Sequence, residues 1–193
     1  EGGTSSATIT VTITGVNDAP VVAQLPPQTN VDAQTGISVN VSSGFTDVDG
    51  TDVLTYAATG LPAGLTLNPT TGLITGTIDN SASQGGTGGV YTVTITADDG
   101  HGGTVAQTFT WTVTNPAPTA NGDSLTVSED DGATAGPNVL GNDNDPDGDD
   151  LTVTEIGAQP VVAAGTSVPG STGGTFFMQP DGSWTFNPGA DYQ

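Results

Sequence analysis

Apolar and polar residues alternate strictly along three long stretches of the chain. The apolar positions are Ala7, Ile9, Val11 and Ile13, then Tyr91, Val93, Ile95 and Ala97, and then Val105, Phe109, Trp111 and Val113. Alternation with a period of two, in segments rich in β-branched side chains, is typical of antiparallel strands that bury one face. Because no stretch keeps a helical period, the sequence predicts an all-β protein.

Shorter apolar runs fill the region between Pro20 and Asn115. They cover residues 37–41, 54–57, 65–67 and 73–78, and they are bounded by Gly, Pro and Asn. Together with the long stretches they give about seven strands, the number found in an immunoglobulin-like sandwich of roughly 100 residues.

A second set of strands is expected after the linker Pro116-Ala117-Pro118. It comprises residues 124–127 and 151–156, a run near Val161, and a hairpin that joins 175–178 to 183–186 through Gln179-Pro180-Asp181-Gly182. In that turn Pro fixes φ, and Gly follows where φ is often positive.

The two sets of strands share sequence features. Asp47-x-Asp49-Gly50 before Leu54-Thr55 matches Asp145-x-Asp147-Gly148 before Leu151-Thr152, and Val16-Asn17-Asp18-Ala19-Pro20 matches Thr114-Asn115-Pro116-Ala117-Pro118. Tandem repeats of one sandwich explain the likeness. We therefore predict three parts: the last strand and linker of a preceding repeat (1–18), a complete sandwich (19–116), and a second repeat that lacks its last strands (117–193).

The charge of the chain is one-sided. It holds 21 Asp and Glu residues, no Lys or Arg, and a formal net charge of -21. Such a surface repels nucleic acid phosphates and anionic lipid headgroups, so neither nucleic acid nor direct membrane contact is expected. Acidic, Gly-rich sequence is also typical of disorder, but disorder does not predict strict alternation.

The acids gather in loops, above all in 47–50 and 143–150. Like charges packed together destabilise a compact state, and this chain has no cationic side chain to offset them. A single Asp-x-Asp-Gly is more often a solvated turn. Clusters of oxygen ligands without internal cations favour a bound hard cation, and flexible sites of oxygen ligands are typical of Ca²⁺.

The chain offers little for catalysis. It has no cysteine, no lysine and no Gly-x-Ser-x-Gly motif. The nucleophilic residues that acyl transfer and Schiff-base chemistry require are therefore missing. Its one histidine, His101, lies in a Gly-rich turn and is expected to be an exposed hairpin residue. Carboxylate pairs for glycoside hydrolysis need an apolar pocket, whereas these acids lie in polar loops. The sequence therefore predicts a protein that is not an enzyme.

Several segments, in this order, resemble the dystroglycan-type cadherin-like, or immunoglobulin-like, repeat. They are Phe45–Gly50, Gly60–Leu65, Asn68–Gly76 and Ala97–Gly100, and they span most of residues 20–115. Residues 119–193, with Ser128-Glu129-Asp130 and Asn142–Gly148, resemble cadherin-like repeats of giant bacterial adhesins of the repeats-in-toxin (RTX) class. The resemblance implies a rod of tandem Greek-key β-sandwiches.

The resemblance also implies Ca²⁺ at the joints between repeats. At the first joint the matching residues are Asn17 and Asp18 in the linker, Asp47 and Asp49 in the Asp-x-Asp loop, and Asp99 in the Ala-x-Asp-x-Gly segment. At the second joint they are Asn115, Asp145 and Asp147, while Pro116 replaces the linker Asp and Pro69-Thr70-Thr71 stands where an Asp-Arg-Glu triplet would lie. We therefore expect metal to matter less for rigidity at the second joint.

The function implied by the resemblance is that of a spacer. The chain would be a calcium-rigidified extender of an extracellular adhesin on a bacterial cell surface, in contact with neighbouring repeats, and would hold a ligand-binding domain away from the cell for adhesion and biofilm formation. Two alternatives remain. Exposed aromatic clusters would favour a module that itself binds a glycan or peptide, and a catalytic sequence elsewhere in the polypeptide would favour an accessory domain of a secreted hydrolase.

The two ends of the chain are predicted to be unpaired. Residues 5–16 form an alternating strand without a neighbour in sequence, and residues 117–193 supply about five strands of a larger sandwich. Exposed strands and open sheet edges invite pairing. We expect residues 5–16 of one copy to complete the C-terminal domain of the next, a head-to-tail contact.

Overall fold

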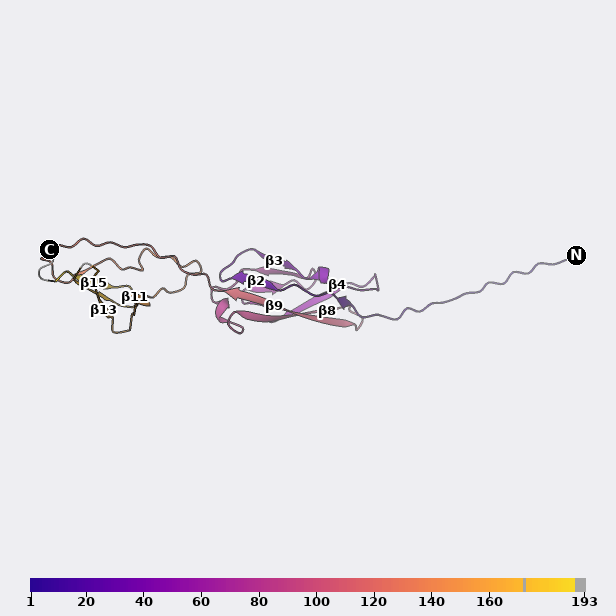
Figure 1. Ribbon diagram of the computed structural model, residues 1–193. Helices are drawn as coiled ribbons and strands as arrows, with labels where there is room; N and C mark the ends of the chain where they lie inside the picture. Colours follow the sequence, from indigo (N-terminus) through magenta and orange to yellow (C-terminus); the bar gives the residue numbers. More distant parts are fainter. Residues whose placement is uncertain (172, 190–193) are drawn as a thin grey trace.

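The computed structural model of the protein describes residues 1–171 and 173–189. Two β-domains lie end to end, and an extended N-terminal segment points away from the end of the middle domain opposite the C-terminal domain (Figure 1). The structure confirms the all-β sandwich expected from the alternation. Within the described residues the helical turns η1 (Ser42–Gly44) and η2 (Ala82–Gln84) are three residues long each, and no helix could cross a membrane.

The middle domain is a sandwich of two sheets. One sheet has the order β2-β9-β8-β5 and the other β3-β7-β6, while β1 pairs with β4 beside them. The strands are β1 (Val21–Val22), β2 (Gln28–Val31), β3 (Ile37–Asn40), β4 (Phe45–Thr46), β5 (Thr55–Thr59), β6 (Leu65–Leu67), β7 (Leu73–Gly76), β8 (Val90–Asp98) and β9 (Thr104–Thr114). The long strands at 91–97 and 105–113 and the runs at 37–41, 54–57, 65–67 and 73–78 are confirmed, whereas the short β1, β2 and β4 were not predicted.

The core of this sandwich comes from the apolar positions of the alternating strands. Val93 and Ile95 of β8, Trp111 of β9 and Ile74 of β7 are completely buried. The Trp111 Nε1 donates a 2.8 Å hydrogen bond to Asn30 Oδ1 on the neighbouring strand β2, so its one polar atom is satisfied.

Only one strand pair of this domain is parallel. Strand β2 runs alongside β9 in the same direction, from the pair Gln28 and Trp111 to the pair Val31 and Thr114. The second strand and the last strand of the sandwich are therefore hydrogen-bonded neighbours. All other strand pairs of the domain are antiparallel.

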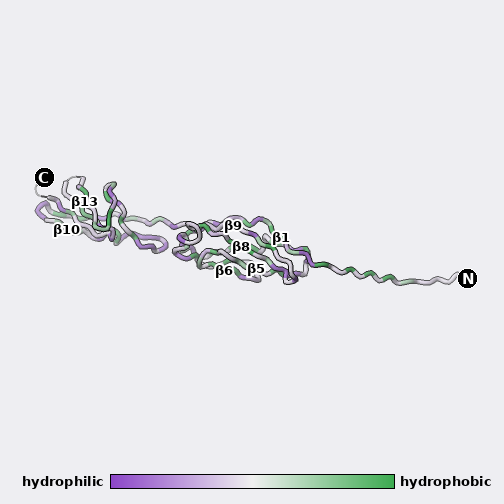
Figure 2. The backbone as a smooth tube through the Cα atoms, turned by 90° about the horizontal axis from the view of Figure 1, so that it is seen from below, coloured by the Kyte–Doolittle hydropathy of each residue, from purple (hydrophilic) through white to green (hydrophobic). Residues whose placement is uncertain are grey.

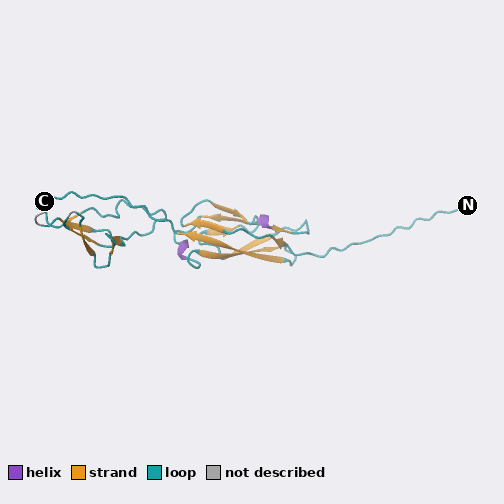
Figure 3. Ribbon diagram, viewed as in Figure 1, coloured by secondary structure: helices purple, strands orange, loops and turns teal. Residues whose placement is uncertain are grey.

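The C-terminal domain contains far less strand (Figure 3). One sheet has the order β10-β15-β14-β13, and β11 pairs with β12 in a short hairpin. The strands are β10 (Thr134–Ala135), β11 (Glu155–Ile156), β12 (Gln159–Pro160), β13 (Thr166–Pro169), β14 (Thr175–Met178) and β15 (Trp184–Asn187). The predicted hairpin at 175–186 is confirmed, with Gly182 at a φ of 81° in its turn.

Two predicted strands of the C-terminal domain are wrong. Residues 124–127 form no strand, and of 151–156 only Glu155–Ile156 does. The alternation itself is right, because Leu125 and Val127 are half-buried against Phe176 and Trp184. A strand also needs a ladder of backbone hydrogen bonds to a neighbour, and among the described residues no ladder includes 124–127, while 151–154 makes only isolated bonds, such as that from the Val153 amide to the Pro180 carbonyl.

The N-terminal segment differs from its prediction in the same way. Residues 5–16 are extended, but no strand ladder includes them, and their apolar side chains are exposed. Figure 2 shows the alternation of apolar and polar residues along this free segment. Its pairing with a second copy stays a prediction, because the structure holds one copy.

Candidate metal centres

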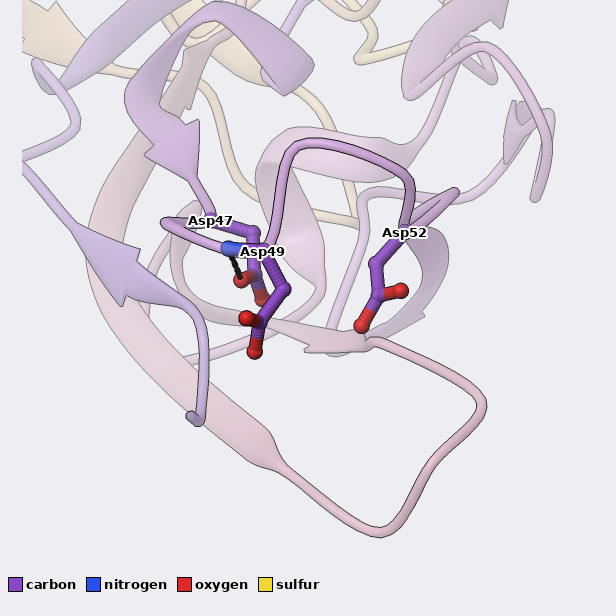
Figure 4. A group of neighbouring side chains, drawn as sticks. All are labelled: Asp47, Asp49 and Asp52. Atoms are coloured by element: carbon purple, nitrogen blue, oxygen red, sulfur yellow. Dashed lines mark hydrogen bonds between the residues drawn. The ribbon is translucent and has the colours of Figure 1, made fainter. Parts of the chain in front are cut away.

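The first group of carboxylates lies at the end of the middle domain where the N-terminal segment enters. Asp47, Asp49 and Asp52 follow β4 in one loop, and each offers an oxygen within 4.8 Å of the others (Figure 4). The Asp49 amide donates a 2.8 Å hydrogen bond to Asp47 Oδ1, which folds the loop so that the carboxylates converge. This group is called the first cluster below.

Residues of the linker are tied to the first cluster and its surroundings. The Asp18 amide donates to Asp49 Oδ2 at 2.8 Å, and Asn17 Nδ2 donates to Asp99 Oδ2 at 2.9 Å. Asn17 also lines a shallow pocket of about 210 Å³ together with Asp49 and Asp52. The structure therefore brings together the linker and the Asp-x-Asp loop as the sequence predicted.

Asp99 holds the neighbouring hairpin rather than facing the cluster. It is 2% exposed, and its Oδ1 accepts hydrogen bonds from the amides of His101 and Gly103 at 2.7 and 2.9 Å. The hydrogen bond from Asn17, followed by those from the backbone, keeps the pKa of Asp99 below its usual value despite its burial. Asp99 thus orders the β8–β9 turn and Asn17, and its role as a metal ligand stays a prediction.

His101 is the exposed hairpin residue that the sequence predicted. Its Nδ1 lies 3.3 Å from Asp52 Oδ2 at the edge of the first cluster.

Buried carboxylate oxygens without partners test whether the first cluster fits a cation. Asp47 Oδ2 is buried and accepts no hydrogen bond, and Asp52 Oδ2 is buried with no hydrogen bond and only the His101 ring nitrogen, 3.3 Å away, as a polar contact. An unpaired buried carboxylate oxygen is costly, and near other carboxylates it is costlier still. A cation with oxygen ligands would satisfy both atoms, so the residues fit a hard metal ion.

The second cluster, Asp145, Asp147 and Asp149, lies in the C-terminal domain. These carboxylates also offer oxygens within 4.8 Å of one another. Asp145 Oδ1 accepts the amides of Asp147, Gly148 and Asp149 at 3.1 to 3.2 Å. Asn115 of the linker donates from Nδ2 to Asp149 Oδ2 at 3.1 Å, so this cluster too is tied to a joint.

Asp147 is the acid of the second cluster with the least favourable surroundings for its negative charge. It is 7% exposed, and neither of its oxygens has a hydrogen-bond partner. The interaction with Asp145, the burial, and the charges of Asp145 and Asp149 raise the pKa of Asp147 to about 6. In the same pair, hydrogen bonds keep the pKa of Asp145 below its usual value. A bound cation would relieve this repulsion, so the second cluster fits a hard metal ion as well.

Sequence reasoning placed most of these residues but missed one member of each cluster. Asp52 and Asp149 were not among the predicted ligands, although each follows an Asp-x-Asp pair by two or three residues. That spacing was a usable signal, since a loop curled by an Asp-x-Asp turn brings the next acid back toward the pair. Pro116 stands where the family pattern has a linker Asp. It does not separate the linker from the second cluster, because Asn115 makes the contact.

One further buried carboxylate lies near the second joint. Asp32 directly follows β2, and its amide donates to the carbonyl of Thr114, the last residue of β9. Asp32 is 3% exposed; its Oδ1 accepts the Ser83 amide at 2.8 Å, while Oδ2 has no partner. This site could not be recognised in the sequence, because Asp32 stands alone in an ordinary polar turn.

Two family models match the chain, one for each domain. Residues 19–114 match the family described as "Putative Ig domain", and residues 115–193 match the family described as "Bacterial cadherin-like domain". The chain is built of immunoglobulin-like and cadherin-like repeats. Repeats of these families are adhesion-type or extender modules and are generally not enzymes. No curated protein matches the sequence.

Solved structures similar to these repeats include cadherins. Drosophila N-cadherin EC1-4 is 15% identical, with a TM-score of 0.45 over 91% of this chain and 42% of its own. Human protocadherin-24 EC1-2 is 19% identical, with a TM-score of 0.41 over 92% of this chain and 81% of its own. A Bacteroides fragilis structure described as a "putative alpha-galactosidase/melibiase" is 22% identical, with a TM-score of 0.37 over 49% of this chain and 17% of its own.

Proposed function

We propose that the chain is a calcium-stiffened extender from an RTX-type adhesin on a bacterial cell surface, where it holds a ligand-binding domain away from the cell. The observation that carries this proposal is the pair of hydrogen bonds by which the linker residues Asn17 and Asp18 reach Asp99 and the first cluster. An ion bound there would contact both sides of a joint and would restrict its bending.

The choice of calcium rests on the ligand chemistry. Each cluster presents carboxylates only, with carbonyl groups and amide side chains nearby, and the chain has no cysteine. Such oxygen donors select hard cations, and irregular loops suit the variable geometry of Ca²⁺ better than the strict octahedron of Mg²⁺. The formal charge of -21 adds attraction for any divalent cation.

The end-to-end arrangement supports a spacer role. The middle domain receives the chain at one end and releases it at the other, toward the C-terminal domain (Figure 1). A row of such domains would gain length with each repeat, provided that the joints stay stiff. The carboxylate clusters lie where that stiffness is needed.

Calorimetric titration and small-angle X-ray scattering test the proposal together. Calcium should bind the chain and lengthen it in solution, and the variant Asp47→Asn/Asp49→Asn should lose binding at the first joint while the middle sandwich stays folded. A matched control, Glu129→Gln/Asp130→Asn, removes the same charge from exposed residues outside both clusters. Equal loss in both variants, or no change in shape with calcium, would refute the proposal.

A second function has one observation in its favour. A groove of about 500 Å³ in the C-terminal domain is lined by Phe176, Trp184 and Met178. Half-buried aromatic residues can stack on sugars or hold a peptide. Titration of oligosaccharides against the fluorescence of Trp184 would test a glycan-binding role.

A further inference from the structure

The sheet of the C-terminal domain has an apolar face that its own chain covers only in part. Across its strands Val168, Phe176 and Phe186 lie side by side, as do Met178 and Trp184. Among the described residues of this domain, only Val168 and Met178 are buried hydrophobic side chains. In a sandwich a second sheet packs on such a face, at about 10 Å.

Loops take the place of that second sheet and leave room. Val139 and Ile156, which lie outside this sheet, line a groove of about 500 Å³ together with Phe176, Met178 and Trp184 of the sheet. A smaller pocket of about 120 Å³ lies beside it, between Leu125, Val127 and the aromatic residues. Among the described residues, Asp123 is the one carboxylate that lines the larger groove.

The N-terminal segment, in turn, carries apolar side chains that pack against no other described part of the chain. Ile9, Val11 and Ile13 are 85%, 76% and 90% exposed. In an extended chain they all project from one face, with Thr8, Thr10 and Thr12 on the other. Exposed strands of this kind pair readily with an incomplete sheet.

Charge favours the meeting of these two surfaces. Residues 2–17 carry no charged side chain, whereas the whole chain has a formal charge of -21. Two copies repel each other wherever their acidic loops approach. The uncharged segment can enter the groove of a second copy with little repulsion, because Asp123 is the one charged side chain among the described residues that line it.

We propose that residues 5–16 of one copy lie in the C-terminal groove of a second copy, with Ile9, Val11 and Ile13 facing Phe176, Met178 and Trp184. The apolar side chains span about 13 Å along the strand. The contact cannot close within one chain, since the middle domain separates the segment from the groove (Figure 1). Copies therefore join head to tail, through unlike surfaces.

Cysteine cross-linking tests this contact directly, because the chain has no cysteine of its own. Two full-length variants, Val11→Cys and Ile156→Cys, are mixed at micromolar concentration under mild oxidation in a chelating buffer. Docking places the thiols together, so the mixed disulfide dimer should form roughly tenfold faster or more than by random collision. The same pairs are also cross-linked with calcium added, so that docking is tested both with and without the proposed metal.

Matched controls separate docking from collision. Thr10→Cys tests the polar face of the same segment, and Val90→Cys tests an exposed site on the middle domain instead of the groove. We expect both controls to cross-link at the collision rate. If Thr10→Cys reacts with Ile156→Cys as fast as Val11→Cys does, or if Val90→Cys is as good a partner as Ile156→Cys, the proposal is wrong.

Sedimentation velocity gives a second readout that does not depend on disulfide cross-linking. The wild-type chain should form larger species as its concentration rises, whereas Val11→Asp/Ile13→Asp should stay monomeric and Thr10→Asp/Thr12→Asp should still associate. Both variants add the same charge in a segment outside both folded domains, so neither should unfold the protein. Equal loss of association in the two variants would show that charge, not the apolar face, governs the contact, and would overturn the proposal.

A peptide copying residues 5–16 identifies the occupant of the groove. In the full-length chain it should shift the fluorescence of Trp184, while a peptide of the same composition without alternation should not. A shift with added oligosaccharide but not with the peptide would make the groove a glycan site and would contradict strand docking.

Discussion

The two domains carry similar acidic loops, but the sheets and cores that hold these loops are very different. In the middle domain the first cluster follows β4 of a complete two-sheet sandwich whose core includes the fully buried Trp111. In the C-terminal domain the second cluster lies in a loop, and the domain has one four-stranded sheet, one two-stranded hairpin and few buried apolar residues. We therefore expect metal bound at these loops to contribute a small part of the stability of the middle domain and a larger part of that of the C-terminal domain.

The difference extends to the acids themselves. In the first cluster the Asp18 amide of the linker donates a hydrogen bond to Asp49, and the Asp49 amide donates one to Asp47. In the second cluster Asp147 is buried with both oxygens unpaired. Without a cation, the weaker domain also carries the less favourable group of charges, so bound metal should matter more for its folding, even if metal contributes less to the stiffness of its joint.

The largest expected effect comes from the core of the middle domain. Trp111→Ala should lower the free energy of unfolding of that domain by about 3–5 kcal/mol, because it leaves a large cavity and removes the partner of Asn30. Met178→Ala in the C-terminal domain should cost less, about 2 kcal/mol, since its surroundings already contain open space. Urea denaturation followed by circular dichroism measures both, and equal costs would contradict the contrast between the two cores.

Calcium should have the next largest effect. At roughly 100 times Kd, each site adds about 2.7 kcal/mol to the stability of the domain that holds it. Each domain contains one tryptophan, so Trp184→Phe leaves Trp111 to report on the middle domain and Trp111→Phe leaves Trp184 to report on the other. We expect calcium to raise the melting temperature of the C-terminal domain more. A shift seen only by Trp111 would reverse this ranking.

The pH dependence of the metal-free chain sharpens the contrast further. Because the folded-state pKa of Asp147 is raised to about 6, the folded domain binds its proton more tightly than the unfolded chain does. Stability of the C-terminal domain should therefore fall as pH rises from about 4 to 6 in chelator. Asp147→Asn should remove this loss, while the exposed-site control Asp130→Asn should keep it. An unchanged profile in Asp147→Asn would exclude Asp147 as its source.

The smallest expected effects concern the amide side chains at the joints. Asn17→Ala removes a partly buried hydrogen bond to Asp99, and Asn115→Ala removes an exposed one to Asp149. Each should weaken calcium binding at its own joint by about two- to tenfold, with the larger loss for Asn17. Calorimetry on each variant checks this order. Loss at the opposite joint would show that the assignment of Asn17 and Asn115 to separate sites is wrong.

Periodicity predicted the middle domain well because most of its strands bury one face and bond to neighbours. Val93, Ile95 and Trp111 occupy the positions that alternation predicts, and they form the core. The short strands β1 and β4 were not predicted, because two-residue segments are too short to show a period. Alternation near Leu125 gave the correct inward face but not a strand, since hydrogen-bonded neighbours cannot be read from one segment alone.

The candidate sites were predictable where ligands are close in sequence. Asp47, Asp49, Asp145 and Asp147 follow from the repeated Asp-x-Asp-Gly. The contacts that join distant segments, such as Asn17 with Asp99, came from the family resemblance and not from spacing. Asp32 could not be found at all, because its burial depends on the packing of β2 against β9 and η2.

The parallel pairing of β2 with β9 has a mechanical consequence. If the chain is pulled from its two ends, β2 is drawn back toward the point where the polypeptide enters the middle domain, and β9 is drawn forward toward the point where it leaves. The evenly spaced hydrogen bonds between them are then loaded all together in shear. Antiparallel strands pulled apart from one end would instead break their hydrogen bonds one after another. The sandwich is thus arranged to resist tension along its long axis before any of its core is exposed.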